Sequence, residues 1–498
     1  MSTVTHPPAP PEAAQAEAPN RRRWLILAVI SIAQLMVVLD ATIVNIALPS
    51  AQRDLGFSND SRQWVVTAYS LAFGGLLLLG GRIADLVGRK TTLLVGLTGF
   101  AAASALAGAA TNFEMLVAGR ALQGVFGALL APTALALLTT TFTDAKERAK
   151  AFGVFSAVAG AGGGIGLLLG GLLTEHLNWR WCLYVNLIFA VIALVGGAVL
   201  LPRHRRDRSV KIDVPGTVTV TGGLFALVYG CGNAETHGWS SAGTWGFLAV
   251  GAVLIALFVW LQTRVAQPLL PLRILSDRNR AASLIAMFIS AAGMFSVNLF
   301  LTYYLQGILG YSPVKTGLAF LPMIGALIVT ATMISNVLVR RVGPRVIVPI
   351  GMALAAAGLV WLTSLEATSG YAGHIMPALI VFGVGLGLIM APAMSNATAG
   401  IDAADSGVGS ATLNTTQQVG GSIGTALLSS LAASAAASYL EGKDATSKAV
   451  QVQSTLESYS TAYWWSAAFF AAGIVICGLL YRRGVPNDDP DAAPVVHM

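Results

Sequence analysis

Fourteen long apolar blocks run through this chain of 498 residues, and each is long enough to cross a lipid bilayer as one helix. A membrane-spanning helix needs about 20 mostly apolar residues, because the hydrocarbon core is about 30 Å thick and a helix rises about 1.5 Å per residue. Only 11% of the residues are charged, whereas a soluble domain carries about 25%. We therefore predict an all-α integral membrane protein with 14 transmembrane helices. The predicted spans are 24–46, 63–80, 92–110, 114–139, 151–173, 181–201, 214–231, 244–262, 281–305, 317–338, 346–364, 374–396, 408–438 and 460–481.

The residue types that carry most enzyme chemistry are scarce and scattered. The three cysteines, Cys182, Cys231 and Cys477, lie in or beside apolar blocks and offer neither a disulfide framework nor metal-ligand spacing. The six histidines show no metal spacing either, and no loop is long enough for a folded soluble domain. We expect no enzyme activity, no catalytic residue, no metal and no cofactor.

Lysine and arginine are distributed unevenly between the loops. With the N-terminus inside, 23 of the 30 basic residues fall in cytoplasmic segments and six in external loops, while Arg120 lies within a span. Cytoplasmic loops of membrane proteins carry such an excess of positive charge. The asymmetry predicts that both termini are cytoplasmic. The net charge of +7 therefore reports orientation and does not indicate a nucleic-acid partner.

The order of the blocks predicts the domain boundaries. Residues 1–23 are rich in Pro, Ala and Glu, a composition typical of disorder, and the first span lacks a cleavage pattern and is expected to remain as an anchor. We expect a six-helix half at 24–201, a linker with two inserted helices at 202–280, a second six-helix half at 281–481 and a cytoplasmic tail at 482–498.

Three motifs of the first half recur in the second half in the same order, with offsets of 255, 260 and 258 residues. The pairs are Gly88-Arg89-Lys90 with Gly343-Pro344-Arg345, Gly127 and Ala131-Pro132 with Gly387 and Ala391-Pro392, and Gly163–Gly166 with Gly421–Gly424. One such match means little, because glycine and proline are common in membrane helices, but three ordered matches predict two copies of a six-helix unit. Transporters built from repeats bind substrate at the interface between the halves.

Four segments of the first half carry longer motifs. They are Leu39–Pro49 in the first span, Gly81–Lys90 after the second, Arg120–Gly124 in the fourth, and a glycine-rich run in the fifth followed by Trp179-Arg180-Trp181 and Asn186. Together they resemble the major facilitator superfamily, specifically its fourteen-helix drug:proton antiporter family of multidrug and antibiotic exporters, over residues 24–481. The resemblance implies the major facilitator fold, with two six-helix halves and two inserted helices. One departure is Leu167, where the family usually has proline after the glycine at 166.

Asp40 and Arg120 are the two charged residues that lie clearly inside the predicted hydrocarbon zone. Placing an ionisable side chain there costs free energy on the order of several kcal/mol unless it faces a cavity or a partner. Both residues are therefore candidates for function. Asp40 lies 16 residues past Trp24, about 24 Å from the cytoplasmic face, and Arg120 lies 7 residues past Phe113, about 10 Å below the outer face. These depths allow the two to meet. We predict that the two residues are coupled. Burial opposes the charged form of the Asp40 carboxyl and a nearby arginine favours it, so small changes around the pair can make Asp40 bind or release a proton. The alternative is a static ion pair that only fixes helix packing.

The loop Gly81–Lys90 is the predicted cytoplasmic gate, and the resemblance supports that role. Its candidate residues are Gly81, Arg82, Asp85, Gly88, Arg89 and Lys90. The loop before span thirteen is the one cytoplasmic loop without Lys or Arg, and it holds Asp402 and Asp405. We expect one of the basic gate residues to pair with these aspartates when the inner side is closed. The alternative is an ordinary positive-inside loop.

Two further groups of residues complete the predicted sites. Glycines Gly162, Gly166, Gly170 and Gly171 of the fifth span should let helix backbones approach closely, as small residues do in membranes. Polar and aromatic residues on spans that should line the cavity suit bulky amphipathic molecules. These candidate substrate-binding residues are Trp64, Tyr69, Gln123, Asn298, Tyr303, Tyr304, Gln306, Asn414, Gln417 and Gln418. Each has an alternative role as an interfacial belt residue or a helix–helix hydrogen-bond partner.

The sequence thus predicts a proton-driven antiporter that exports hydrophobic or amphipathic drugs by alternating access. We expect a multi-pass protein of a bacterial plasma membrane, a monomer, with protons, a small amphipathic substrate and the bilayer as its partners. The main alternative is a transporter of the same fold for a defined metabolite, lipid or siderophore.

Overall fold

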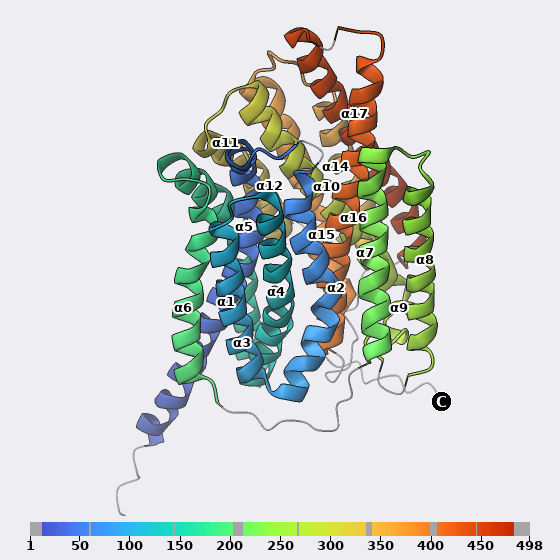
Figure 1. The fold of residues 1–498 in the computed structure, drawn as a ribbon. Helices are drawn as coiled ribbons and strands as arrows, with labels where there is room; N and C mark the ends of the chain where they lie inside the picture. Colours follow the sequence, from blue (N-terminus) through green and yellow to red (C-terminus); the bar gives the residue numbers. More distant parts are fainter. Residues whose placement is uncertain are drawn as a thin grey trace, which may run out of the picture.

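The chain folds into a bundle of long helices (Figure 1). The structure is a computed structural model that describes residues 12–58, 61–142, 145–202, 213–265, 268–334, 341–398, 406–444 and 446–482, and no strand occurs in those ranges. The first-half helices are α1 Glu12–Leu55, α2 Gln63–Val87, α3 Arg89–Gly108, α4 Phe113–Thr141, α5 Ala145–His176 and α6 Trp181–Leu200. The inserted pair is α7 Val214–His237 and α8 Ala242–Gln262. The second half contains α9 Arg273–Ser276, α10 Arg278–Tyr303, η1 Tyr304–Ile308, α11 Pro313–Ala319, α12 Leu321–Val329, η2 Thr330–Ile334, α14 Pro344–Leu362, η3 Tyr371–Ile375, α15 Met376–Thr398, α16 Ser406–Leu440 and α17 Lys448–Leu480.

The predicted membrane architecture is confirmed. Thirteen helical segments in the described ranges are long and apolar enough to span a bilayer. The remaining predicted span, 151–173, lies within α5, a continuous helix of 32 residues. We call the end of the bundle that carries the Gly81–Lys90 segment the inner end, and the opposite end, where α17 begins, the outer end.

Two helices, α1 and α17, begin twelve residues earlier than the sequence predicted. Residues 12–23 were expected to be disordered, but α1 already begins at Glu12. Ala, Glu and Gln in this stretch favour helix, and extending a helix that already exists avoids the cost of nucleation. At the other end of the chain, α17 begins at Lys448 and not near 460. Its first turns are too polar to read as a span, yet Leu456 and Tyr459 are buried in the core.

The two six-helix halves pack by the same scheme, which supports the predicted repeat. In the first half α1 packs on α4, α5 and α6, while α4 packs on α2 and α3. In the second half α10 packs on α15, α16 and α17, while α15 packs on α12 and α14. The halves meet along two seams, α2 with α16 and α5 with α11.

The inserted pair covers one of these seams. Helices α7 and α8 pack on each other, and α7 also packs on α2 and α16, as Figure 1 shows at the right of the bundle. The Thr221 hydroxyl donates to the Gly75 carbonyl of α2 at 3.0 Å. At the inner end, the Gln262 side chain of α8 donates to Asp213 at 2.8 Å and accepts from the Leu270 amide at 3.0 Å. These bonds hold the pair as a side wall of the α2–α16 seam.

Helix α5 reaches its neighbours through glycines on two faces. A side-chain carbon at Gly166 or Gly170 would collide with α1, and for Gly166 the obstructing groups are Thr42 and the Leu39 carbonyl. At Gly162 the added carbon would make a tight contact with Leu35 of α1 at 3.1 Å. A carbon at Gly171 would lie 2.7 Å from Pro313 O and 2.7 Å from Val314 Cα of α11. The predicted close approach is therefore observed, within the first half for the first three glycines and between the halves for Gly171.

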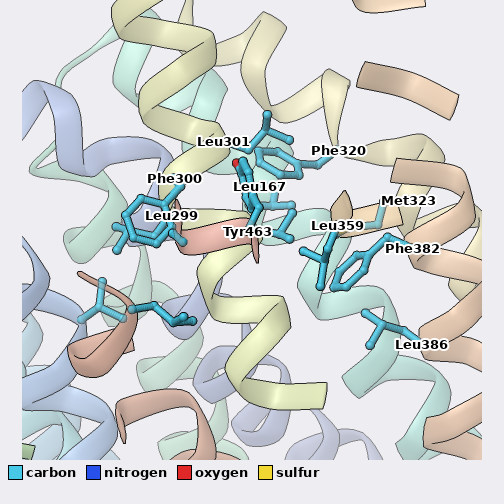
Figure 2. Packing of buried hydrophobic residues seen from close by; sticks show 14 of the residues in the cluster. Leu167, Leu299, Phe300, Leu301, Phe320, Met323, Leu359, Phe382, Leu386 and Tyr463 are labelled. Atoms are coloured by element: carbon cyan, nitrogen blue, oxygen red, sulfur yellow. The ribbon is translucent and has the colours of Figure 1, made fainter. Parts of the chain in front are cut away.

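A buried apolar cluster extends across the α5–α11 seam (Figure 2). Leu167, which stands where the resembled family has proline, is 2% exposed and belongs to this cluster with Phe320 and Met323 of the second half. Helix α5 therefore continues unbroken through this position and contributes an apolar side chain to the contact between the halves.

Candidate functional site

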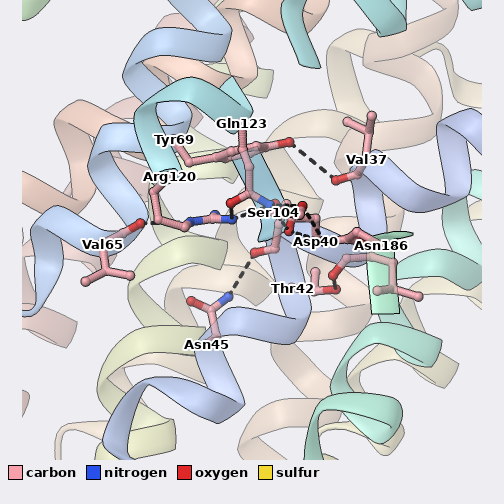
Figure 3. Close-up of polar contacts among 12 residues, drawn as sticks. Val37, Asp40, Thr42, Asn45, Val65, Tyr69, Ser104, Arg120, Gln123 and Asn186 are labelled. Carbon is pink, nitrogen blue, oxygen red and sulfur yellow. Dashed lines mark hydrogen bonds and ion pairs between the residues drawn. The ribbon is translucent and has the colours of Figure 1, made fainter. Parts of the chain in front are cut away.

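Asp40 and Arg120 form an ion pair in the middle of the first half (Figure 3). Arg120 Nη1 of α4 donates to Asp40 Oδ2 of α1 at 2.6 Å. The Asp40 and Arg120 side chains are 0% and 1% exposed. The predicted meeting of the two residues is observed, because the rise of a helix fixes the depth of each residue and α1 packs directly on α4.

Two amides complete the shell of donors around Asp40. Its Oδ1 accepts from Gln123 Nε2 at 2.8 Å and from Asn186 Nδ2 at 2.7 Å. Gln123 Oε1 also accepts from Arg120 Nη1 at 2.9 Å, as expected for residues three apart on one helix face. The Ser104 hydroxyl of α3 accepts from Gln123 at 2.6 Å and from Asn186 at 3.3 Å. One polar network thus joins α1, α3, α4 and α6.

Arg120 is held on its other side by α2. Its Nε donates to the Val65 carbonyl at 3.1 Å, and its guanidinium carbon lies 4.4 Å from the centre of the Tyr69 ring. The Tyr69 hydroxyl donates to the Val37 carbonyl of α1 at 3.4 Å. Tyr69 was predicted to bind substrate, but here it forms one wall of the ion-pair site.

Sequence reasoning missed part of this network. Asn186 was noted only as part of a resembled motif, and Ser104 was not noted at all. A serine in an alanine-rich helix gives no signal in its spacing, and only the packing of α3 on α4 and α6 brings Ser104 to the site. Gln123 was predicted to bind substrate, and the structure places it fully buried in the ion-pair network.

The network can hold a charged carboxylate away from water. Removing an ion pair from water costs several kcal/mol (order of magnitude) per ion, and the cost is offset only when the remaining polar atoms are also paired. Asp40 meets this condition, because both oxygens accept hydrogen bonds. A proton arriving on Asp40 would remove the charge that orients three donors from two other helices.

The predicted gate residues contact backbone carbonyls at the inner end. Arg82 donates to the Pro268 carbonyl at 2.7 Å, so the gate segment touches the linker that follows the inserted pair. Arg89 donates to the Ala136 carbonyl at 3.3 Å, and Lys90 donates to the Ala198 and Leu201 carbonyls, each at 2.7 Å. Gly88 separates α2 from α3 with a φ of 102°, a conformation that favours glycine.

Part of the gate prediction lies outside the described residues. Asp402 and Asp405 belong to the undescribed segment 399–405, and the Asp85 side chain is likewise not described. The expected pairing of Arg82, Arg89 or Lys90 with Asp402 and Asp405 stays a prediction.

The ten candidate substrate residues are not gathered into one pocket. Trp64 stacks near Tyr229 of α7 with ring centres 5.8 Å apart, and the Tyr304 hydroxyl donates to the Glu366 carbonyl at 2.6 Å. Asn298 is 4% exposed within α10. Gln417 and Gln418 lie on α16, and a side-chain carbon added at Gly74 of α2 would lie 2.8 Å from Gln418 Cβ. Asn414 is half-buried on the same helix.

Two of the candidates join the halves at the outer end. Tyr303 donates from its hydroxyl to Gln52 Oε1 at 2.8 Å, and Gln306 donates to the Ile46 carbonyl at 3.1 Å. The Val314 amide of α11 also donates to Glu175 of α5 at 3.0 Å. Among the described residues, these hydrogen bonds between the halves all lie at the outer end, which is therefore closed.

Comparisons with known proteins agree with this architecture. A family model described as Major Facilitator Superfamily matches residues 30–425. The chain belongs to the major facilitator superfamily. Its members transport solutes, so this chain is a multi-pass membrane transporter and not an enzyme.

Curated relatives and solved structures extend the comparison. A puromycin resistance protein of Streptomyces alboniger is 49% identical, with 94% of this chain and 92% of that protein covered. A cephamycin export protein of Amycolatopsis lactamdurans is 39% identical, with coverage of 80% and 82%. A bacterial homologue of the lysosomal transporter Spinster, solved in an inward-facing, unoccupied state, matches with a TM-score of 0.64 and 14% identity, over 92% of this transporter and 97% of that chain.

Proposed function

We propose that this transporter is a proton-driven antiporter that exports hydrophobic or amphipathic compounds from a bacterial cell across the plasma membrane. The observation that carries the proposal is the fully buried Asp40 with its three donors, because a carboxylate inside the membrane zone marks the proton relays of pumps and transporters. Relatives named for puromycin resistance and cephamycin export support an antibiotic-like substrate.

In this mechanism the charged and protonated forms of Asp40 favour different helix arrangements. With the carboxylate charged, Arg120, Gln123 and Asn186 hold α1, α4 and α6 together. Protonation from the outside weakens these bonds and lets α1 and α4 shift relative to α2 and α5, which form the seams with the second half. Release of the proton to the inside restores the pair. Substrate moves outward in the other step of the transport cycle, when no proton is carried inward.

The gate segment Gly81–Lys90 would close the inner end when the outer end opens. We propose that Arg82, Arg89 or Lys90 then exchanges its carbonyl contact for an ion pair with Asp402 or Asp405. We also propose that both termini are cytoplasmic and that the protein works as a monomer. Reversing both aspartates to lysine should impair transport. Transport and gate populations that match the wild type would contradict this closure.

The decisive experiment reconstitutes the protein in liposomes with an imposed pH gradient. Puromycin is the first compound to test, together with a fluorescent amphipathic dye. We expect gradient-driven accumulation by the wild type and its loss in Asp40→Asn, with binding of the compound retained.

Other outcomes separate the alternatives. Accumulation that survives Asp40→Asn would exclude Asp40 as the proton carrier. No accumulation in either protein, combined with movement of a defined metabolite, lipid or siderophore, would replace the drug-export proposal with a specialist transporter of the same fold.

A further inference from the structure

A cavity lies away from the Asp40 site, at the outer end of the second half. Its volume is about 460 Å³, which is within the range of small-molecule sites, about 300–1,000 Å³. The walls come from α10, η1, α16 and α17, and Arg62, just before α2, closes one side. Among the ten candidate substrate residues, only Tyr303 contributes to this lining.

The cavity is positively charged. Arg62 and Lys448 are lining residues, and none of the lining residues is a carboxylate. Within the described part of the chain, neither Arg62 nor Lys448 forms an ion pair. Arg62 is half-buried, and its guanidinium carbon lies 3.9 Å from the centre of the Tyr303 ring. A partly desolvated guanidinium without a counter-charge favours an anionic ligand.

The remaining walls are mixed: Ser429, Gln451, Thr455 and Ser458 are polar, and the others are apolar or aromatic. Phe300 and Tyr459 pack together with ring centres 5.8 Å apart, and both are buried. Val452, Ile308 and three alanines of α16 complete the apolar surface. The cavity therefore offers cationic groups for the head of a ligand and an apolar surface of several side chains for its body.

We propose that this cavity is a binding site for an anionic amphiphile, a molecule with a phosphate or carboxylate head and an apolar chain. The head would contact Arg62 and Lys448, and the chain would lie against Phe300, Tyr459 and Val452. Arg62 orients the head because Tyr303 fixes its guanidinium plane. The site is separate from the Asp40 network and does not depend on proton-driven export, so it binds without a pH gradient.

Binding of octyl phosphate to the purified full-length protein, in neutral maltoside micelles and followed by calorimetry, tests the proposal. We expect saturable binding by the wild type, and a loss of affinity of about 10- to 100-fold in Arg62→Gln and in Lys448→Gln, because each loses a charge-assisted contact. Lys443→Gln is the matched control. Lys443 is a cation at the same end that contacts Tyr439 but does not line the cavity.

A shape variant and two other ligands examine the amphiphilic part of the proposal. Ala433→Trp fills the cavity while leaving both cations in place, and it should abolish binding in protein that keeps the wild-type elution profile and thermal midpoint. Octyltrimethylammonium and inorganic phosphate should bind at least ~10-fold more weakly than octyl phosphate. Equal binding of either ligand, or unchanged affinity in both charge variants, would overturn the proposal.

Competition experiments distinguish the source of the ligand. Displacement of octyl phosphate by phosphatidylglycerol in nanodiscs would identify the ligand as a lipid whose headgroup lies at the outer face of the membrane that contains the protein. Displacement by dodecanoate but not by phosphatidylglycerol would identify a soluble anionic amphiphile, and displacement by neither would contradict the site. Asp40→Asn should retain binding, so a failure of the antiport proposal and a failure of this one give different results.

Discussion

At the scale of single residues, Asp40 determines how the buried polar groups of the first half are arranged. Three side chains donate to its carboxylate, and a fourth, Ser104, accepts from two of those donors. Removing one member of such a network leaves the others buried and unpaired, which costs more than the net contribution of the pair. Stability and transport can therefore be separated by changing both partners together.

We expect Asp40→Asn to destabilise the protein by about 3–5 kcal/mol, because Arg120 stays buried without a counter-charge. The double variant Asp40→Asn with Arg120→Gln should be more stable than Asp40→Asn alone, because no uncompensated charge remains. Chemical unfolding in detergent measures both changes. Additive losses in the double variant would show that the two side chains are not energetically coupled. Neither variant should transport against a gradient.

At the scale of one element, α5 shows how a single helix serves two contacts. Gly162, Gly166 and Gly170 repeat every four residues and face α1 inside the first half, whereas Gly171 faces α11 in the second half. Substitutions on the first face should therefore disturb folding. A substitution at Gly171 should instead disturb the balance between open and closed outer ends.

We expect Gly171→Ala to open the outer end, because the added carbon would lie 2.7 Å from the backbone of α11 at Pro313 and Val314. Gly163→Ala is the matched control, since nothing lies within 4 Å of the added carbon at that position. Distances between spin labels on the outer ends of α5 and α11, determined by electron paramagnetic resonance, measure the effect. A longer distance in Gly163→Ala, or an unchanged one in Gly171→Ala, would contradict the assignment of the two faces.

The same helices show what the sequence could predict. The depth of Asp40 and Arg120 followed from helix rise alone, and the repeat followed from motif order, so the ion pair and the two halves were predictable. The partners of Tyr303, Tyr304 and Trp64 were not. A contact depends on how each helix is rotated and on which helix lies beside it, and neither property is encoded in apolar block length. The position of α7 and α8 beside the α2–α16 seam could not be predicted for the same reason.

At the scale of the whole molecule, the outer end is closed by a few separate contacts between the halves. Tyr303 reaches Gln52, Gln306 reaches α1, and Glu175 of α5 accepts from Val314 of α11. Each polar contact contributes about 0.5–1.5 kcal/mol at most. The polar contribution to closure is therefore small and adds to the apolar contact across the α5–α11 seam, so single substitutions of these polar groups should shift closure measurably.

Glu175 should make closure sensitive to acid on the outer side. A hydrogen bond with Ser312 and the bond from the Val314 amide lower the pKa of Glu175 below its ordinary value of 4.5. Because the pKa is lowered by the closed contact, its stabilising contribution is complete above 4.5 and is lost as the pH falls through the lowered pKa. The closed fraction of the wild type should therefore approach that of Glu175→Gln only as the pH falls below 4.5 and through the lowered pKa. An equal difference between the two proteins at all pH values would contradict this role.

Tyr303→Phe removes one closing contact that lies beside the cavity. The substitution removes the hydroxyl that donates to Gln52 but keeps the ring under Arg62. We expect the open population of the outer end to rise by about 2- to 10-fold, the equivalent of one net hydrogen bond. Labels at the outer ends of α1 and α10 measure it. Octyl phosphate affinity should fall less than in Arg62→Gln, because both cations and the ring stay in place and only the hydrogen bond of the Tyr303 hydroxyl to Arg62 is lost. An unchanged open population would mean that the Tyr303–Gln52 bond does not contribute to closure, and a loss of octyl phosphate affinity as large as that in Arg62→Gln would show that closure and the cavity act as one unit.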